Sequence, residues 1–405
     1  MRIAIITTSY PAFLRELYLN APGLERKSYS EQLAARNSSL FGFADFYSRG
    51  FKAHGHEAVE FHLNNTHLQA AWAREHGFTV QLPEGDPHAG QRLGALPKRL
   101  LAPLKPMMRP IIRRLWPLNP PAWQLEILRA QIDAFKPDIL YNQEPAVMRS
   151  PLLRTFRAPG RWIAGQVASA LPAGEDFSAY DLMVSSLPNF VAQFRARNVP
   201  AICNRLAFDP AVLGQVHQPK ERDIPISFVG NLSLDHPGRL ALLEKIAERL
   251  PLQMWGSGID QLSPSSPLRK CHHGEAWGRA MYEIMGRSKL TLNFHASFSG
   301  HHANNLRLYE STGMGALLLN DRKRDLPEMF APGDEVVAYD SPEDCAAKAE
   351  SLLSNDGERA MIANAGQQRT LCAHNYVVRT GELLEAFKRV QAGQARANWL
   401  SKTPG

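Results

Sequence analysis

This sequence of 405 residues has no long apolar run and few cysteines, and each absence excludes a class of protein. No apolar stretch approaches the roughly 18–20 residues that a membrane-spanning helix needs. The N-terminal run Ile3–Ile6 ends at Thr7, which is too short for the core of an export signal. The 4 cysteines lie far apart without a Cys-x-x-Cys pair, as expected of reduced thiols. These features predict a cytoplasmic protein.

The sequence also lacks several motifs that carry well-defined chemistry. It has neither the Gly-x-x-x-x-Gly-Lys-Ser/Thr loop of nucleoside triphosphate sites nor the Gly-x-Ser-x-Gly turn of hydrolases. No Asp-x-Asp is present, which disfavours transferases that hold a nucleotide diphosphate through a divalent metal. Adjacent histidines occur at His272-His273 and His301-His302, but neighbours in regular structure point apart. We therefore expect neither a metal site nor a bound cofactor.

The composition itself is typical of globular domains. Hydrophobic residues make up 44% and charged residues 21%, which excludes a disordered chain, a collagen and a coiled-coil rod. At roughly 100–200 residues per domain, the length predicts two or three domains. The net charge of +7, from 46 Lys and Arg against 39 Asp and Glu, favours anionic partners such as phosphates without identifying one.

Short apolar runs alternate with amphipathic segments, and the pattern occurs twice. Such alternation predicts parallel sheets covered by helices on both faces, here two α/β domains with a polar seam near residues 205–222. The strands expected in the first half are Ile3–Ile6, Ala58–Phe61, Ile139–Tyr141, Trp162–Val167 and Leu182–Val184. Those expected in the second half are Ile226–Val229, Leu252–Trp255, Leu290–Phe294, Leu317–Leu319 and Val336–Tyr339.

One segment departs from this alternation. Residues 87–125 contain no acidic side chain, and seven basic residues are interleaved there with Leu, Met, Ile and Trp. Eight prolines in the same segment forbid one long helix. Two interpretations stay open: a solvated excursion from the first domain, or a patch that binds a membrane surface or an anionic acceptor.

The most informative stretch is KLTLNFHASFSGHHANNLRLYESTGMGALLLND, residues 289–321, which predicts strand, polar loop, helix and strand. In doubly wound sheets, ligands bind where strand ends meet helix N-termini. Asn304 or Asn305 can cap this helix. Arg307 can bind a phosphate with two nitrogens, and Glu310 can accept hydrogen bonds from both ribose hydroxyls. Alternatively, Arg307 and Glu310 form only a surface ion pair worth about 0.2–0.5 kcal/mol.

The run Asn305-x-Arg307-x-x-Glu310 with Gly315-Ala316 after it resembles the C-terminal domain of glycosyltransferases of the GT-B fold. The resemblance is strongest to the CgeB-like family (spore-maturation-protein type), which has a C-terminal domain of the glycosyl transferases group 1 kind. It extends over most of the chain, and the motifs from Asn305 to Arg379 are the more specific ones.

The resemblance implies two Rossmann-like α/β domains that face each other across a cleft. Residues 1–210 would form the acceptor-side domain, and residues 211–380 the domain that binds a nucleotide-sugar. Residues 381–405 would form a helix that returns toward the first domain, followed by a tail.

The same resemblance implies roles for individual residues. Glu310 would bind the ribose, and Gly230, Arg239 and the loop Gly300–Asn305 would face the diphosphate. Gly256 and Gly274 lie on loops near the expected place of the base. Without a metal, arginines must stabilise the departing nucleoside diphosphate, and Arg239 and Arg307 are the candidates.

The catalytic residues are less well defined. Many retaining GT-B enzymes have two glutamates eight positions apart, and the first touches the donor sugar. Here His302 stands eight positions before Glu310, so either His302 takes that role or the loop is rearranged. An inverting reaction needs a base for the acceptor hydroxyl. Glu144, after the strand Ile139–Tyr141, and Asp45 are candidates, although each is also a residue type found in caps and on surfaces.

These interpretations favour a metal-independent glycosyltransferase that uses a UDP-, GDP- or dTDP-linked sugar. Its acceptor would be a glycan, glycolipid or protein, as in cell-surface polysaccharide biosynthesis. The enzyme would be cytoplasmic, with residues 87–125 as a contact to the inner face of the membrane, and would bind no nucleic acid. The alternatives are a nucleotide-sugar epimerase or hydrolase of the same fold, or a non-catalytic basic protein that binds membranes or nucleic acid.

Overall fold

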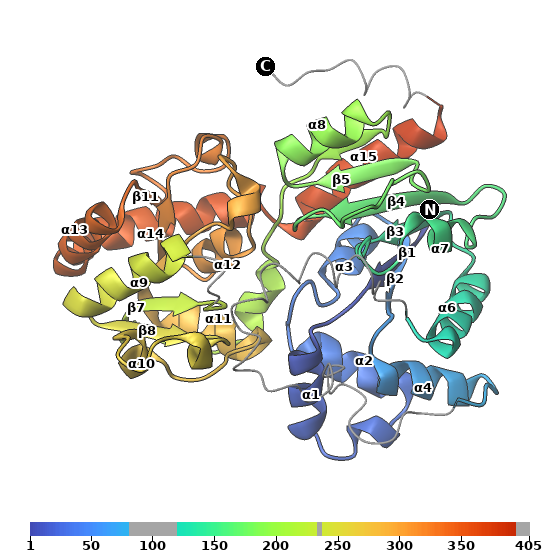
Figure 1. Ribbon diagram of the computed structural model, residues 1–405, viewed down its shortest axis with the longest axis horizontal. Coiled ribbons are helices and arrows are strands. Elements are labelled where there is room, and N and C mark those ends of the chain that lie inside the picture. The colour runs from blue at the N-terminus through green and yellow to red at the C-terminus, as the bar shows by residue number, and fades with distance from the viewer. Residues whose placement is uncertain (81–119, 233–236, 394–405) are drawn as a thin grey trace. The chain divides into compact units, whose positions relative to one another are not determined.

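The computed structural model describes residues 1–80, 120–232 and 237–393, which form two α/β units (Figure 1). Unit 1 consists of Met1–Cys203 and the chain from Gly381 onward, and unit 2 consists of Asn204–Thr380. The division at Cys203 falls a few residues before the predicted domain end at residue 210.

Unit 1 is built on a parallel sheet whose described strands have the order β2-β1-β3-β4-β5-β6. All residues of β3 and β5 are buried, as the continuous apolar runs in the sequence require when helices cover both faces of a sheet. The described elements of unit 1 up to Cys203 are β1 (Arg2–Thr7), α1 (Pro11–Leu19), η1 (Leu24–Arg26), α2 (Tyr29–Ser38), α3 (Phe46–Ala53), β2 (Glu57–His62), α4 (Thr66–Glu75), α6 (Ala122–Phe135), β3 (Ile139–Asn142), α7 (Ser150–Arg154), β4 (Trp162–Val167), β5 (Leu182–Ser185), α8 (Pro188–Ala196) and β6 (Ala201–Cys203).

Unit 2 is a second parallel sheet, in which the described strands have the order β11-β10-β9-β7-β8. Helix α9 packs against α13, and α12 packs against α14. The described elements of unit 2 are η3 (Pro210–Gly214), β7 (Ile224–Val229), α9 (Pro237–Arg249), β8 (Leu252–Trp255), η4 (Ile259–Gln261), α10 (Leu268–Cys271), α11 (Gly278–Arg287), β9 (Ser288–Asn293), η5 (Ser297–Ser299), α12 (Arg307–Gly313), β10 (Leu317–Asp321), η6 (Leu326–Glu328), β11 (Val337–Tyr339), α13 (Pro342–Ser354), α14 (Asp356–Ala373) and α15 (Tyr376–Gln391).

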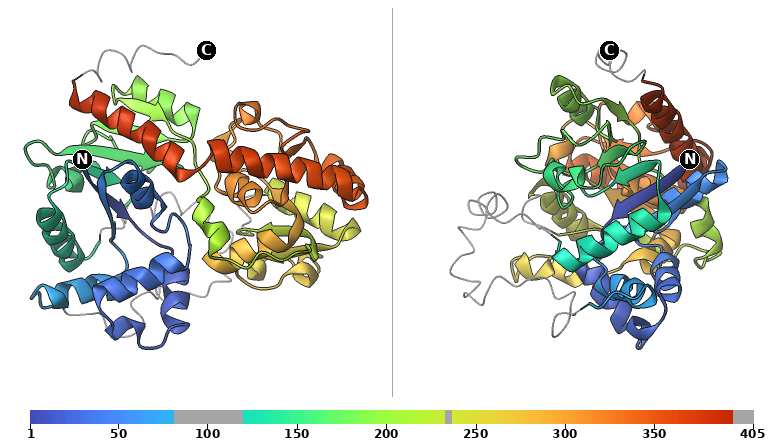
Figure 2. Two further views of the ribbon diagram at one scale, coloured as in Figure 1. Left: turned by 180° about the vertical axis from the view of Figure 1, so that it is seen from behind. Right: turned by 90° about the vertical axis from the view of Figure 1, so that its right-hand side faces the viewer.

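Helix α15 begins in unit 2, and from Gly381 its residues belong to unit 1. Figure 2 shows this C-terminal helix in red from behind. Within unit 1, the ring of Phe387 lies 5.8 Å from that of Tyr141 and 6.2 Å from that of Phe51. These aromatic contacts attach the C-terminal helix to the core of unit 1.

The prediction of two parallel-sheet α/β domains is confirmed. Every strand predicted from the sequence is present, to within two residues at either end. Strand β6 was not predicted, because its three residues are too few to form a recognisable apolar run.

The described residues contain no helix that combines the length and the apolar composition needed to cross a bilayer. Most of the basic segment predicted over residues 87–125 lies outside the described residues, which resume at residue 120. The membrane or acceptor contact proposed for that segment stays a prediction.

Unit 1 buries a cluster of polar side chains beside β2. Arg36 of α2 is 2% exposed, Glu60 is 8% exposed and His62 is fully buried. Ser48 donates hydrogen bonds to Glu60 from its backbone N–H at 3.0 Å and its hydroxyl at 2.8 Å. Burial nevertheless raises the pKa of Glu60 to about 7, because the hydrogen bonds from Ser48 offset only part of the lost hydration. The folded protein therefore favours the protonated form of this carboxyl group.

We predict that Glu60 makes the protein less stable as the pH rises from about 4.5 to about 7. In that window the folded state keeps the Glu60 proton, whereas the unfolded chain releases it near the ordinary pKa of 4.5. Because the folded state binds more protons, its free energy of unfolding decreases with rising pH. Glu60→Gln removes this effect. The free energy of unfolding of the variant, relative to that of the wild type, should therefore increase by about 1–3 kcal/mol from pH 4.5 to pH 7.5.

Urea unfolding of both proteins across this pH range measures the difference. Glu57→Gln is the matched control, because Glu57 lies on the same strand with an exposed side chain. The control should keep the pH dependence of the wild type. An unchanged pH dependence in Glu60→Gln would contradict the prediction.

Candidate functional site

The strand order of unit 2 creates a topological switch point between β7 and β9. Strand β7 has β8 on one side and β9 on the other, and ligands of doubly wound sheets bind outside the carboxyl ends of such strands. These ends are Val229 of β7 and Asn293 of β9. Most residues predicted to bind the donor make contacts at or next to these two strand ends.

Arg307 and Glu310 form an ion pair in this region. Nη1 of Arg307 contacts Oε2 of Glu310, and Nε of Arg307 donates to the carbonyl oxygen of Val229 at 2.8 Å. Only 4% of the Glu310 side chain and 25% of the Arg307 side chain are exposed. The pair is therefore not the solvated surface pair of the alternative interpretation, because its carboxylate is buried.

Tyr282 of α11 is a third member of this group. Its hydroxyl donates to Oε1 of Glu310 at 3.3 Å. Burial, and after it the neighbouring charge of Glu310, raises the pKa of Tyr282 well above its ordinary value. The phenol thus stays protonated and serves as a hydrogen-bond donor to the carboxylate.

Backbone hydrogen bonds bring together the three glycines predicted for the diphosphate and the base. Gly230 donates to the carbonyl oxygen of Trp255 at 2.9 Å, and Gly256 donates to that of Gly274 at 2.8 Å. The rings of Trp255 and His273 stack beside them, with centroids 5.1 Å apart. The loops after β7 and β8 therefore meet at one edge of the sheet.

The guanidinium group of Arg239, on α9, donates hydrogen bonds to backbone carbonyl oxygens. Nη1 donates to Asn231 at 3.0 Å and Nη2 donates to Phe294 at 3.0 Å. Burial lowers the pKa of Arg239 despite the nearby charge of Asp321. Arg239 thus ties the loop after β7 to the loop after β9, and its contact with a diphosphate stays a prediction.

Asn305 belongs to a network of amide side chains. It exchanges hydrogen bonds with Asn293 at 2.7 and 3.1 Å, and Asn293 donates to Asn320 at 2.6 Å. The Asn305 side chain also accepts from the backbone N–H of Leu308 at 3.2 Å, so it caps the first turn of α12. The helix predicted from about Asn304 begins only at Arg307, because these side-chain bonds hold the preceding residues in a loop.

His302 lies in the loop between β9 and α12. Its Nδ1 is 3.2 Å from Oδ2 of Asp325, a buried carboxylate in the segment that follows β10. The His302 side chain is 24% exposed. His302 is thus placed at the same sheet edge as Arg307, and its role in catalysis stays a prediction.

A cavity of about 350 Å³ lies at the carboxyl ends of β10 and β11. This volume is in the range of small-molecule sites. In its wall, Asp321 accepts a hydrogen bond from Nδ1 of His295 at 2.6 Å. The cavity is lined by Gly238, Ala241, Leu242, Phe294, Asp321, Arg322, Tyr339, Asp340, Ser341 and Pro342.

Unit 1 has its own switch point, between β1 and β3, and Glu144 lies there. The backbone N–H of Thr8, after β1, donates to Oε1 of Glu144, after β3, at 3.3 Å. Burial raises the pKa of Glu144, and the hydrogen bonds of Thr8 offset only part of the effect. A raised pKa suits a general base, since it strengthens the affinity of the carboxylate for a proton.

The second base candidate, Asp45, has different surroundings. Its carboxylate lies 3.1 Å from Nε of Arg49 on the first turn of α3, and about one third of each side chain is exposed. Such a pair is common on helix surfaces and contributes about 0.3–0.5 kcal/mol. Of the two predicted bases, the surroundings of Glu144 are closer to those of a catalytic carboxylate.

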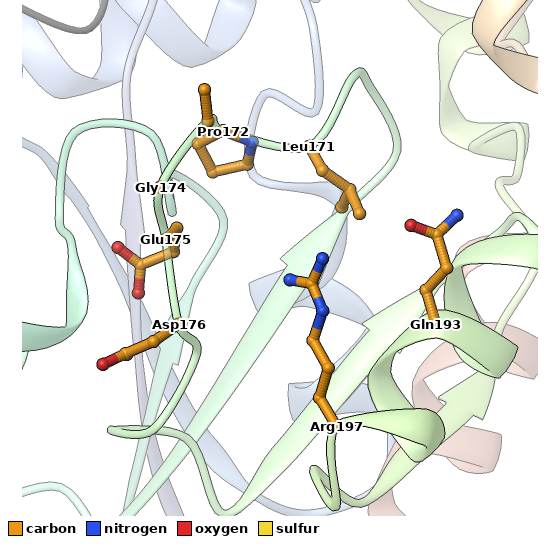
Figure 3. Close-up of a pocket in the computed structure, with 8 residues that line it drawn as sticks. Leu171, Pro172, Gly174, Glu175, Asp176, Gln193 and Arg197 are labelled. Carbon is orange, nitrogen blue, oxygen red and sulfur yellow. The ribbon is translucent and has the colours of Figure 1, made fainter.

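Unit 1 also contains a pocket of about 650 Å³, between the loop after β4 and α8 (Figure 3). In the figure, Arg197 points toward the loop, whereas the carboxylates of Glu175 and Asp176, which belong to the loop, point away from Arg197. Glu175 accepts a hydrogen bond from the backbone N–H of Ser150 at 3.0 Å, so its carboxylate is stabilised by a group of unit 1 outside the pocket. The pocket therefore presents a guanidinium group, the amide of Gln193 and the aliphatic surface of Leu171 and Pro172.

The two units together define a GT-B fold, which solved structures share over nearly the whole chain. A glycosyltransferase from Rickettsia africae has a TM-score of 0.55 and 11% identity, and covers 96% of this chain and 98% of its own. Sucrose-phosphate synthase from Thermosynechococcus elongatus has a TM-score of 0.55 and 12% identity, and covers 97% of this chain and 100% of its own. Anabaena Alr3699/HepE in complex with UDP-glucose has a TM-score of 0.55 and 11% identity, and covers 96% of this chain and 99% of its own.

Within this fold, residues 239–385 match the family model described as glycosyl transferase-like. Comparison with curated proteins gave no match. The family match and the shared fold support a GT-B glycosyltransferase, and the matched residues include Arg239, Arg307 and Glu310.

Several residues of the site were not predicted from the sequence. Tyr282 lies on an amphipathic helix, where buried aromatic residues are common, so its position in the sequence does not distinguish it from a core residue. Asp325 stands in the charged run Asp-Arg-Lys-Arg-Asp after β10, which is typical of a solvated turn. Arg197 lies just after α8, without a motif that would single it out.

We predict that Gly256→Ala disrupts the meeting of the loops after β7 and β8. Gly256 has a φ of 148°, and a Cβ atom there would lie 1.9 Å from the carbonyl oxygen of Gly230. Gly274 also has a positive φ, 96°, but a Cβ atom there would meet nothing within 4 Å. Gly274→Ala therefore tests backbone strain alone, with an expected cost of about 1 kcal/mol, whereas Gly256→Ala adds a steric clash of about 1–3 kcal/mol.

Thermal unfolding of the two variants checks this prediction. The melting temperature of Gly256→Ala should lie clearly below that of Gly274→Ala. Equal melting temperatures would show that the close approach of Gly256 to Gly230 does not matter to the fold.

Proposed function

We propose that this protein is a metal-independent glycosyltransferase that transfers a sugar from a nucleotide-sugar to a glycan, glycolipid or protein acceptor. The observation that carries the proposal is the Arg307–Glu310 pair, which lies at the switch point of a GT-B fold. A nucleotide needs a hydrogen-bond acceptor for its ribose hydroxyls and a hydrogen-bond donor for its phosphates. A buried carboxylate beside a guanidinium group supplies both.

The donor side of the proposal uses the contacts at the ends of β7 and β9. Glu310 accepts from the ribose hydroxyls in place of its present bond to Arg307. Nη1 of Arg307 then becomes available to a phosphate oxygen, and Nη2 has no hydrogen-bond partner within the described residues. The related structure of Anabaena Alr3699/HepE was solved with UDP-glucose, which supports a uridine nucleotide as the first donor to test.

Arginine takes the place of a metal ion in this proposal. Negative charge develops on the nucleoside diphosphate as the glycosidic bond breaks, so fixed positive charge near the phosphates lowers the barrier. Arg307 is oriented by the carbonyl of Val229, and Arg239 by the carbonyls of Asn231 and Phe294. Guanidinium groups held in place by the backbone need little reorganisation when the charge develops.

On the acceptor side, we assign Glu144 as the base that receives the proton of the acceptor hydroxyl. It is at the switch point of unit 1, and burial raises its pKa. We assign the pocket with Arg197 to the acceptor, because a guanidinium group and an amide can hold the hydroxyl or anionic groups of a glycan.

Finer assignments rest on the sequence motifs. Membership of the CgeB-like family is proposed from the run Asn305 to Arg379. A role in cell-surface polysaccharide biosynthesis, a cytoplasmic location and a membrane contact through residues 87–125 are proposed from the composition and from this resemblance.

The donor site predicts how nucleotides change stability. Among UDP, GDP, dTDP and CMP, at least one should raise the melting temperature, because a ligand at a hundred times its Kd adds about 2.7 kcal/mol. Glu310→Ala should abolish most of this shift and weaken nucleotide binding about 10–100-fold, because two charge-assisted hydrogen bonds to the ribose are lost. Differential scanning fluorimetry and calorimetric titration measure both effects.

Glu350→Ala is the matched control, since Glu350 is an exposed glutamate of the same unit on α13. It should retain the full nucleotide shift. If Glu310→Ala folds and binds the nucleotide as tightly as the wild type, Glu310 has no part in the donor site. If none of the four nucleotides shifts the wild type, the proposed function is wrong.

The acceptor side predicts a separation of binding from transfer. Glu144→Gln should keep the nucleotide Kd within about twofold and lower the rate of transfer by about 10²–10⁴-fold, because the amide cannot take up the acceptor proton. Release of nucleotide from a sugar-nucleotide, with a panel of glycan and lipid acceptors, measures the rate. Glu126→Gln, an exposed change in the same unit, should behave as the wild type. Full activity in Glu144→Gln would exclude Glu144 as the base.

A further inference from the structure

The loop between β9 and α12 presents a histidine whose ring is held by a buried carboxylate. Nδ1 of His302 lies 3.2 Å from Oδ2 of Asp325, which is only 3% exposed. Nδ1 faces this buried group, and the His302 side chain as a whole is 24% exposed. The opposite nitrogen, Nε2, has no hydrogen-bond partner among the residues that the structure describes.

Two donors besides His302 hold the carboxylate of Asp325 in place. Its Oδ1 accepts from the backbone N–H of Ala303 at 2.7 Å, and its Oδ2 accepts from Nη1 of Arg205 at 2.7 Å. Arg205 also binds Glu328 at 2.8 Å, which keeps its guanidinium group in place. Since arginine and a backbone N–H only donate, both oxygens of Asp325 act as acceptors.

This arrangement decides the tautomer of His302. A carboxylate oxygen that already accepts from Arg205 can only accept from the imidazole as well, so Nδ1 must carry the hydrogen. In the neutral ring, Nε2 then carries the lone pair. His302 thus offers an acceptor, rather than a donor, to a ligand.

The backbone on either side of His302 is also fixed. The carbonyl oxygen of Gly300 accepts from Nζ of Lys323 at 3.1 Å, and that of His301 accepts from the backbone N–H of Arg324 at 2.8 Å. With Ala303 bound to Asp325, the loop is held before and after the histidine. A ring held through both its backbone and its Nδ1 keeps one orientation, as a preorganised binding group requires.

The geometry points to Asp325 as a positioning residue that presents Nε2 of His302 as the hydrogen-bond acceptor for a hydroxyl group of the donor sugar. The inference rests on the proposed function, because it requires a nucleotide-sugar at the carboxyl end of β9. The loop of His302 leads directly into α12, which carries Arg307 and Glu310. The inference places the sugar of a nucleotide bound at Arg307 along this sheet edge, where its hydroxyls can donate hydrogen bonds to a neutral imidazole.

The test compares the affinity for a nucleotide with the affinity for its sugar conjugate. UDP with UDP-glucose, GDP with GDP-mannose and dTDP with dTDP-glucose are the probes, and calorimetric titration gives both Kd values. His302→Ala and Asp325→Asn should raise the Kd of the sugar conjugate about 3–10-fold relative to that of the nucleotide, since one neutral hydrogen bond is lost. His301→Ala is the control, because the neighbouring side chain is exposed and should leave this ratio unchanged.

The outcomes separate this inference from the proposed function. A nucleotide that binds in a Glu310-dependent way, with the same Kd ratio in Asp325→Asn as in the wild type, overturns the inference alone. A ratio that changes in His302→Ala but not in Asp325→Asn overturns the role of Asp325. Binding of no nucleotide and no sugar conjugate overturns both proposals.

A measurement on the wild type keeps the inference testable if Asp325→Asn fails to fold. Long-range ¹H–¹⁵N NMR of histidine-labelled protein distinguishes the two tautomers, and His302→Ala assigns the signal. We expect the Nδ1–H form, with unprotonated Nε2. A wild-type signal from the Nε2–H form would contradict the inference, whereas a purely structural role of Asp325 would leave the Kd ratio untouched.

Discussion

The attachment of the loop after β9 to the segment after β10 is the interaction on which the candidate donor site depends. Asp321 accepts from Nδ1 of His295 at 2.6 Å and from its backbone N–H at 3.1 Å, and Asp325 accepts from Ala303 at 2.7 Å. Burial alone would raise the pKa of Asp321, but the bonds and charges of His295 and Lys323 more than offset it, so the pKa is lowered. A loop fixed before the ligand arrives loses little conformational entropy on binding.

Buried charge at strand ends is costly, and both units contain it at their switch points. Glu310 in unit 2 is 3% exposed, and its charge is met by Arg307 and the hydroxyl of Tyr282. In unit 1, the carboxylate of Glu144 accepts a long bond from the backbone N–H of Thr8, and burial raises its pKa. An apolar pair would fill such places at lower cost, so these charges suit a site whose ligand completes their hydrogen bonds.

The sequence was sufficient for the fold and for part of the site. Apolar runs such as Trp162–Val167 fall on strands because parallel strands are buried on both faces, whereas β6 is too short to show this pattern. The pair Arg307 and Glu310 was predictable because both lie on one turn of a helix. The bonds from Tyr282 to Glu310 and from Arg205 to Asp325 join residues 28 and 120 positions apart, so they follow only from the tertiary fold.

In the proposed donor site, the present pairing of Arg307 with Glu310 would let one site serve both parts of a nucleotide. Each residue satisfies the other while Nε of Arg307 stays bound to Val229, so the guanidinium group keeps its position when its partner changes. A ribose that takes over Glu310 releases Nη1 of Arg307 toward the phosphates, and a diphosphate that takes over Arg307 releases Glu310 toward the ribose. The two exchanges favour each other, because breaking the ion pair costs its free energy only once. A ligand that carries both groups therefore gains more than the sum of either group alone.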